Sequence, residues 1–235
     1  KVRYLDWGGD GQPLLALHGL ASSAHWYDIV APLLRDRYHI YAPDQRGHGQ
    51  TTAAPTGYDW KTLSDDMAGL LDHIGLDKVA VMGHSWGGNV ALEYAFSNPS
   101  APGGLCLIDG GTIEISAVPG MTLERAREEM APPDFTGVQV EQFREMVRSR
   151  DFGFEVTPEI EEMMMYTFDV LEDNTVVARF SRASHMKVID AFWEHKPSAL
   201  YSHIKCPVLL VPTRNGADQH SDEWRARGRD WLERA

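Results

Sequence analysis

Short apolar runs recur along the chain, and longer stretches with a helical spacing of apolar residues separate them. Each run is about four residues long and is bounded by glycine, proline or aspartate, which is typical of strands buried on both faces of a sheet. This pattern predicts six strands. They are Val2–Leu5, Leu14–Leu17, His39–Ala42, Val79–Met82, Leu105–Ile108 and Val208–Val211.

The stretches between these runs predict helices. In Thr62–Ile74 the apolar residues form one helical stripe, and Gly75 provides a stop signal. Two further helices are expected at Ser23–Leu34, with Ser22 or Ser23 as its cap, and at Asn89–Ser97. Alternation of strands and helices predicts an α/β fold with a mostly parallel central sheet and helices on both faces.

The alternation stops after Asp109 and resumes at Cys206-Pro207-Val208. The residues between are mainly of helical character, with helices expected at Thr122–Met130, Val140–Arg148, Pro158–Phe168 and Ser181–His195. Because the sheet pattern continues afterwards, we interpret residues 112–196 as an inserted helical cap. Residues 1–111 and 197–235 then form one core, with its C-terminal strand and helix missing.

The candidate chemistry begins at Gly83-His84-Ser85-Trp86-Gly87, directly after the apolar strand Val79–Met82. A serine in G-x-S-x-G between a strand and a helix sits on a sharp, strained turn with its hydroxyl exposed. The N-terminal N–H groups of the following helix favour negative charge that develops near that hydroxyl. The pattern therefore predicts Ser85 as a nucleophile.

Two earlier loops complete this prediction. His18-Gly19-Leu20 follows the strand Leu14–Leu17, and acyl transfer needs two backbone donors for an oxyanion. We expect these donors to be the N–H groups of Leu20 and Trp86, with His18 shaping the loop. In Asp44-Gln45-Arg46-Gly47-His48-Gly49 we expect a compact turn in which Arg46 pairs with an acid and His48 serves as scaffold; a direct role of His48 in the chemistry is the alternative.

The segments LALHGLASSAHWYDIVAPL, YAPDQRGHGQT and VMGHSWGGNVALEYA together resemble the α/β-hydrolase family. They are similar to its oxyanion strand, its Asp-x-Arg-Gly-x-Gly loop and its nucleophile elbow, in that order. The resemblance covers Val2–Gly110 and resumes at Cys206–Val211. It implies an α/β-hydrolase core and a serine esterase or lipase-like chemistry in which Ser85 works with an acid and a histidine.

The resemblance places the acid after the strand Val208–Val211, which favours Asp218. Asp109 ends the preceding strand of the sheet and is a competing candidate, and Asp222 is a third. The histidine is expected after a further strand and helix, and no histidine of this sequence occupies that place. We therefore expect the catalytic histidine beyond Ala235.

Composition narrows the remaining possibilities. The formal net charge of −12 argues against a nucleic-acid partner. No apolar run is long enough to span a membrane, and Cys106 and Cys206 read as free thiols, so a cytoplasmic location is expected. No metal-binding or nucleotide-binding motif appears, so we expect no metal or cofactor. The expected partner is a small-molecule ester, bound by a monomer or homodimer.

These inferences predict a cofactor-free serine hydrolase that cleaves a carboxylic ester or lactone of a small apolar substrate through an acyl-enzyme. Residues expected to line the substrate pocket are Trp26, His84, Phe168 and Met164. Ser85 in place of an aspartate argues against epoxide and haloalkane hydrolysis, because those reactions pass through an alkyl-enzyme ester. The alternatives are a catalytically inactive small-molecule binding protein of this fold, or a hydrolase of amide or carbon–carbon bonds.

Overall fold

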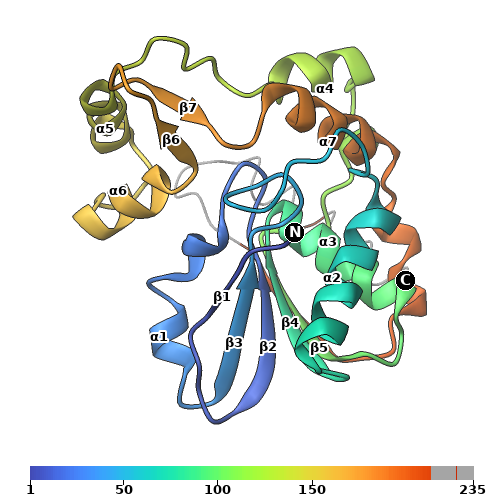
Figure 1. Ribbon diagram of the computed structural model, residues 1–235. Helices are drawn as coiled ribbons and strands as arrows, with labels where there is room; N and C mark the ends of the chain where they lie inside the picture. Colours follow the sequence, from blue (N-terminus) through green and yellow to red (C-terminus); the bar gives the residue numbers. More distant parts are fainter. Residues whose placement is uncertain (213–225, 227–235) are drawn as a thin grey trace.

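The central feature of the fold is a six-stranded sheet, seen in a computed structural model that describes residues 1–212 and Ala226 (Figure 1). The strand order is β1-β3-β2-β4-β5-β8. The strands are β1 (Tyr4–Asp6), β2 (Gln12–Leu17), β3 (Tyr38–Pro43), β4 (Val79–His84), β5 (Pro102–Ile108) and β8 (Val208–Val211). Only the β1–β3 pairing is antiparallel within this sheet, so the prediction of a mostly parallel sheet with these six strands is confirmed.

Helices cover both faces of the sheet. Leu15 and Leu17 of β2 face the cluster that contains α2 (Trp60–Ile74) and α3 (Trp86–Ser97). Their neighbours Leu14 and Ala16 belong to a second cluster, with Tyr27 and other residues of the chain that follows β2. Since successive strand residues point to opposite faces, these two clusters lie on opposite sides of β2. The predicted fold class is therefore correct.

The segment Ser23–Leu34 is not the single helix that its sequence predicts. It forms a 3-10 helix, Ala24–Tyr27, and then the short helix α1 (Ala31–Leu34). Pro32 explains the break, because it has no N–H to donate to the preceding turn and its ring excludes the carbonyl four residues earlier. Ser23 occupies the cap position but its side chain makes no capping hydrogen bond.

The helix expected at Asn89–Ser97 begins earlier, at Trp86. Its first residue therefore follows Ser85 directly, as the predicted strand–turn–helix arrangement at Ser85 requires. The α2 helix agrees closely with its prediction: Asp59 caps it by accepting from the Thr62 N–H at 2.9 Å, and it ends at Gly75.

The chain between β5 and β8 is mainly helical, and it also contains a β-hairpin. Its helices are α4 (Leu123–Glu129), α5 (Val140–Ser149), α6 (Pro158–Met165) and α7 (Arg182–Glu194); its strands are β6 (Phe168–Val170) and β7 (Val176–Ala178); and its 3-10 helices are Ile115–Ala117, Pro197–Ala199 and Tyr201–His203. The hairpin corrects the expected helix Pro158–Phe168, which stops at Met165. Asp173-Asn174 is the hairpin turn, where Asn174 has a positive φ of 63°.

This segment packs in two ways. Residues of α4 and α7, among them Ala126 and Ile189, join the same hydrophobic cluster as α2 and α3. In contrast, α5, α6 and the β6–β7 hairpin, which we call the outer layer, have a small cluster of their own around Phe143 and Met165. Figure 1 shows the outer layer above the α1 side of the sheet, with α4 and α7 above the opposite side.

Candidate active site

The turn at Ser85 is built around close backbone contacts. Ser85 lies between β4 and α3 with φ 51° and ψ −122°, a conformation that L-residues rarely adopt. A Cβ at Gly83 would lie 2.3 Å from the carbonyl oxygen of Gly87, and a Cβ at Gly87 would lie 2.4 Å from those of Leu17 and His18. Only glycine fits at both positions, which explains the G-x-S-x-G spacing.

Backbone strain gathers around this turn. In the part of the chain that the structure describes, four non-glycine residues have a positive φ: Ala21, Ser85, Asp109 and Asn174. Asn174 belongs to the hairpin turn, whereas the first three follow the carboxyl ends of β2, β4 and β5. Parallel strands present their carboxyl ends at one edge of the sheet, which is where sites of α/β folds form. Strained residues that cluster in this way identify this edge of the sheet as the candidate functional site.

The Ser85 side chain is half-buried, and within residues 1–212 its hydroxyl has no hydrogen-bond partner. Its backbone is held firmly, since the Ser85 N–H donates to Ile108 at 2.8 Å and its carbonyl accepts from the Gly88 N–H at 2.8 Å. The hydroxyl is therefore presented by a fixed backbone and is not hydrogen-bonded to any residue that the structure describes.

The loop after β2 lies directly beside this serine. A Cβ at Gly19 would lie 3.4 Å from the Ser85 Cβ. The Gly19 carbonyl accepts from His18 Nδ1 at 2.8 Å and from the Ser22 N–H at 3.2 Å. Because the N–H of a trans peptide points opposite to its C=O, these bonds turn the Leu20 N–H away from His18.

Among the described residues, the N–H groups of Leu20 and Trp86 donate no hydrogen bond. These are the two amides that the sequence predicts as oxyanion donors. Trp86 is the first residue of α3, so its N–H adds to the positive end of that helix. The arrangement can stabilise negative charge that develops beside Ser85.

His18 is a structural residue of this loop. Its side chain is fully buried, and its Nε2 accepts from the Gln45 N–H at 3.0 Å, so Nδ1 carries the proton that Gly19 accepts. Burial lowers the pKa of His18 to about 4, against opposing effects of the Gly19 hydrogen bond and of Asp44. Both ring nitrogens are occupied, which confirms that His18 shapes the loop.

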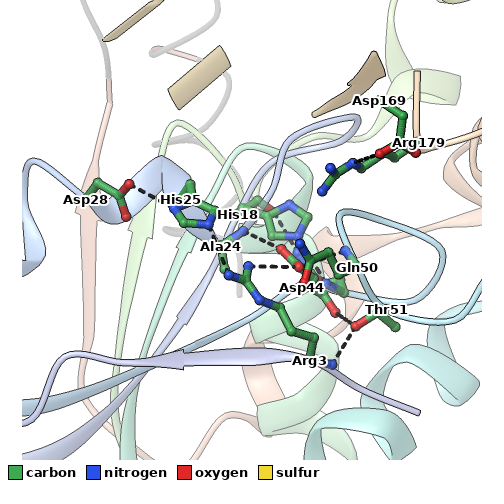
Figure 2. Close-up of polar contacts among 11 residues, drawn as sticks. Arg3, His18, Ala24, His25, Asp28, Asp44, Gln50, Thr51, Asp169 and Arg179 are labelled. Atoms are coloured by element: carbon green, nitrogen blue, oxygen red, sulfur yellow. Dashed lines mark hydrogen bonds and ion pairs between the residues drawn. The ribbon is translucent and has the colours of Figure 1, made fainter. Parts of the chain in front are cut away.

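Asp44 holds the next loop together, as Figure 2 shows. Its buried carboxylate accepts from the N–H of Ala24 at 2.8 Å, from the N–H of Gln50 at 2.9 Å and from Arg3 Nη1 at 3.1 Å. Arg46 makes two hydrogen bonds of 2.7 Å to Asp66. The expected compact turn and the expected pairing of Arg46 with an acid are both confirmed.

Two of the residues expected to line the pocket lie at this edge of the sheet. The His84 ring stacks on Trp26 with centroids 4.6 Å apart, and within the described residues His84 Nδ1 has no partner. Burial lowers the pKa of His84, and the negative charge of Asp109 opposes this effect.

The other two expected pocket residues, Phe168 and Met164, lie in the outer layer. Phe168 packs on Phe143 with ring centroids 4.3 Å apart, and Met164 joins the same cluster.

The candidate acids are only partly placed. Asp109 follows β5, with its side chain exposed and its N–H bonded to the Val211 carbonyl at 2.9 Å. Gly110, the next residue, packs on the Ser85 backbone. Asp218 and Asp222 lie outside the described residues, as does the expected histidine beyond Ala235. No histidine of residues 1–212 makes a hydrogen bond with Ser85.

Sequence reasoning missed how far buried polar side chains organise this site. Gln45 and His48 are both almost fully buried and both reach the loop after β2. The signal in the sequence is the run Asp44–Gly49, in which polar residues directly follow a buried strand.

Within the described ranges no helix is long and apolar enough to cross a membrane. The same residues contain no group of three or more His, Cys, Asp or Glu side chains arranged to hold a metal ion.

Comparison with known proteins adds a family. A family model described as alpha/beta hydrolase fold matches residues 12–171. A soluble epoxide hydrolase from Corynebacterium sp. (strain C12) is 40% identical over 101 residues, which are 43% of this chain and 35% of that protein. The match therefore spans about a third of the length of this curated relative.

Two solved structures are similar over most of the chain. An E-2-(acetamidomethylene)succinate hydrolase has a TM-score of 0.76 at 20% identity and covers 97% of this chain and 83% of its own. An esterase from Exiguobacterium antarcticum has a TM-score of 0.68 at 21% identity and covers 89% and 76%. At these identities the likeness shows the fold alone.

Proposed function

The chain belongs to the alpha/beta hydrolase fold family, and on that premise we propose that it is a serine hydrolase that cleaves a carboxylic ester or lactone through an acyl-enzyme. The observation that carries the proposal is the serine at φ 51° between β4 and α3, beside two amides without acceptors among the described residues. A nucleophile and its oxyanion donors at one place are what acyl transfer requires.

In this proposal Ser85 attacks the substrate carbonyl, and the N–H groups of Leu20 and Trp86 stabilise the oxyanion of the tetrahedral intermediate. A histidine outside the described residues takes the proton of the Ser85 hydroxyl and passes it to the leaving alcohol. Asp218 or Asp109 orients that histidine. Water then attacks the acyl-enzyme by the same route and releases the acid.

The serine itself supports acyl transfer over epoxide opening. An epoxide opens on a carboxylate nucleophile through an alkyl-enzyme ester, and hydrolysis of that ester regenerates the carboxylate. A serine would form a stable ether with the same substrate. For this reason we do not extend to this chain the activity in the name of its relative from Corynebacterium.

The substrate side of the proposal rests on the segment after β5. We propose that residues 112–196 act as a cap over Ser85, with Trp26, His84, Phe168 and Met164 contributing to an apolar pocket. The free thiols Cys106 and Cys206 suit a cytoplasmic protein. Amide hydrolysis is the second candidate, favoured by the acetamido compound named for the structure with a TM-score of 0.76.

Labelling of the full-length protein with a fluorophosphonate tests the proposal, because that reagent phosphonylates an activated serine. We expect one label at Ser85, found by peptide mass spectrometry, and at least a 1000-fold loss of ester hydrolysis in Ser85→Ala. Asp109→Asn and Asp218→Asn identify the catalytic acid, since substitution of the residue that orients the histidine should lower kcat by about 10⁴-fold.

A substrate panel then separates the candidate reactions. We expect neutral medium-chain or aromatic esters to be cleaved faster than charged esters and faster than the matching amides. A folded wild-type protein that binds such molecules but is never labelled at Ser85 would instead be a binding protein of this fold.

A further inference from the structure

The imidazole of His48 lies between the loop after β2 and the segment after β5. The ring is fully buried. Its Nε2 accepts the N–H of Ala21 at 3.1 Å, and its Nδ1 donates to the Arg46 carbonyl at 3.0 Å. These two bonds require the neutral tautomer with the proton on Nδ1. Burial, and then the neighbouring His18, lower the pKa of His48 well below 6.5, which keeps Nε2 an acceptor.

The bond from Ala21 fixes the direction of the oxyanion loop. Ala21 follows Leu20 and has a positive φ of 57°, which needs support from its surroundings. The peptide unit before Leu20 is held at the Gly19 carbonyl by His18 and by the Ser22 N–H, and the unit after it is held by His48. The Leu20 N–H can therefore change direction only if one of these bonds breaks.

The face of the same ring packs on Phe180, which lies between β7 and α7. The two rings are stacked with centroids 3.7 Å apart and planes at 12°. Gly47 makes room for this contact, since a Cβ there would lie 3.3 Å from the Phe180 ring and 2.5 Å from the Tyr58 hydroxyl. The indole of Trp86, the second oxyanion residue, lies 5.3 Å from the His48 ring. The His48 imidazole is thus hydrogen-bonded to Ala21, next to Leu20, and lies beside Trp86. It also stacks on Phe180 of the segment after β5.

We propose that His48 is a positioning residue, which links the packing of Phe180 to the alignment of the Leu20 and Trp86 amides. The inference rests on the proposed serine hydrolase function. His48 acts through Ala21 and Trp86 and does not itself touch the reacting atoms. Loss of the Phe180 contact then lowers the rate of acyl transfer even though Phe180 is remote from the Leu20 amide in sequence.

Three substitutions separate the two contacts of the ring. His48→Phe keeps an aromatic ring against Phe180 but removes the acceptor for the Ala21 N–H. His48→Gln keeps an acceptor oxygen near the position of Nε2 but removes the ring. Phe180→Leu keeps the wild-type histidine and removes the stack. Tyr166→Leu is the matched control, because it breaks the stack of Tyr166 on His25, centroids 3.5 Å apart, and the hydrogen bonds of the His25 ring go to Arg3 and Asp28 instead of the oxyanion loop.

The readout is kcat and KM for a neutral p-nitrophenyl ester, with the second-order rate of fluorophosphonate labelling at Ser85. Removal of one oxyanion donor costs about 10²- to 10³-fold in kcat, so a misaligned donor should cost less. We expect kcat to fall about 30-fold in His48→Phe and about fivefold in His48→Gln and in Phe180→Leu, with KM within twofold. Because both break one stack, combining Phe180→Leu with His48→Gln should add little. Tyr166→Leu should keep kcat within twofold.

The inference is overturned if the His48 and Phe180 variants lose thermal stability but keep kcat and the labelling rate within twofold of wild type. His48 would then have only a structural role. Equal losses in Tyr166→Leu and Phe180→Leu would also overturn it. Phe180→Leu, a conservative apolar change, decides the matter if the His48 variants do not fold. Wild-type protein that is not labelled at Ser85 removes the proposed function itself, whereas labelled wild-type protein with unaffected variants removes only the role of His48.

Discussion

The loops around Ser85 and the outer layer of α5, α6 and the β6–β7 hairpin are stabilised in different ways. Around Ser85, backbone atoms approach so closely that a Cβ at Gly83 or Gly110 would lie within 2.3 Å of a carbonyl oxygen. The outer layer instead has a small apolar cluster, ion pairs of Glu161 with two arginines, and exposed apolar residues such as Met146 and Val170. The first region tolerates almost no displacement, whereas the second can change in sequence without moving Ser85. A hydrolase can thus vary its substrate range while its chemistry stays fixed.

The largest expected effect on stability comes from substitution of Gly83, with Gly69 as the matched control. Gly83→Ala places a Cβ 2.3 Å from the Gly87 carbonyl oxygen, and both are backbone positions that cannot rotate away. We expect a loss of unfolding free energy of about 4 kcal/mol or more, together with loss of Ser85 labelling. Gly69→Ala lies on the exposed side of α2 with no atom within 4 Å, so it should stabilise the protein by about 0.5–1 kcal/mol. Urea unfolding measures both.

If Gly83→Ala were as stable as wild type, the backbone at the turn would have room to relax. The contrast between the two regions would then be wrong at its strongest point. A destabilised Gly69→Ala would instead show that glycine substitutions in general, and not the close contact at Gly83, account for the loss.

Local sequence patterns predict the strand and the turn at Ser85 well, because the features that form them depend on residues close together in the sequence. An apolar run predicts the buried strand, and the close contact of Gly83 with Gly87 is between residues only four positions apart. The contacts that organise the site are not local: His48 and Phe180 are far apart in the sequence, and β4, β5 and the outer layer lie between them along the chain. No pattern within the Asp44–Gly49 loop identifies that partner.

The outer layer was predicted less well for a related reason. The Pro158–Phe168 stretch has helical character, but its end pairs with β7 as a strand, and only the turn at Asp173-Asn174 hints at the hairpin. Tertiary packing overrides local propensity where an element is short. Local patterns also do not decide between Asp109 and Asp218, because that choice depends on which carboxylate the fold brings to the proposed catalytic histidine.

Acid should weaken the two regions in separate pH windows, which is the next largest expected effect. Burial lowers the pKa values of His18, His48, His84 and His185, that of His18 to about 4. An unfolded chain binds protons at these histidines near pH 6.5, whereas the folded chain does not. These histidines therefore cause the free energy of unfolding to fall as the pH drops from 6.5 towards 4.

Urea unfolding between pH 7.5 and 5.0 measures this slope. His185→Gln, which keeps a donor for the Met130 carbonyl, should reduce the slope, and His73→Gln at an exposed position should leave it unchanged. A free energy of unfolding that is flat over this range would show that the buried histidines take up protons while folded. An equal change of slope in both variants would show that the burial of His185 does not cause the change.

Glu161 gives the smallest expected effect and tests the outer layer alone. Its carboxylate, on α6, pairs with Arg144 and Arg148 of α5, and hydrogen bonds from Arg148 and then Arg144 lower the pKa of Glu161 to about 2. Its stabilising effect is therefore present above about pH 4.5 and is lost as the pH falls towards 2, below the window of the histidines. Because Arg148 is 47% exposed and solvent screens the pair, Glu161→Gln should lower the unfolding free energy by only about 1 kcal/mol at pH 7.5.

That deficit should stay constant between pH 7.5 and 5.5 and shrink in 1 M salt or below pH 4.5. Glu145→Gln, at an exposed position on α5, the helix that carries Arg144 and Arg148, is the control and should change little. Above all, Glu161→Gln should leave the fluorophosphonate labelling rate at Ser85 within twofold of wild type, because the outer layer and the Ser85 turn do not share a core. A loss as large as that of Phe180→Leu would mean that loosening α5 and α6 already moves Phe180, and the two regions would have to be treated as one mechanical unit.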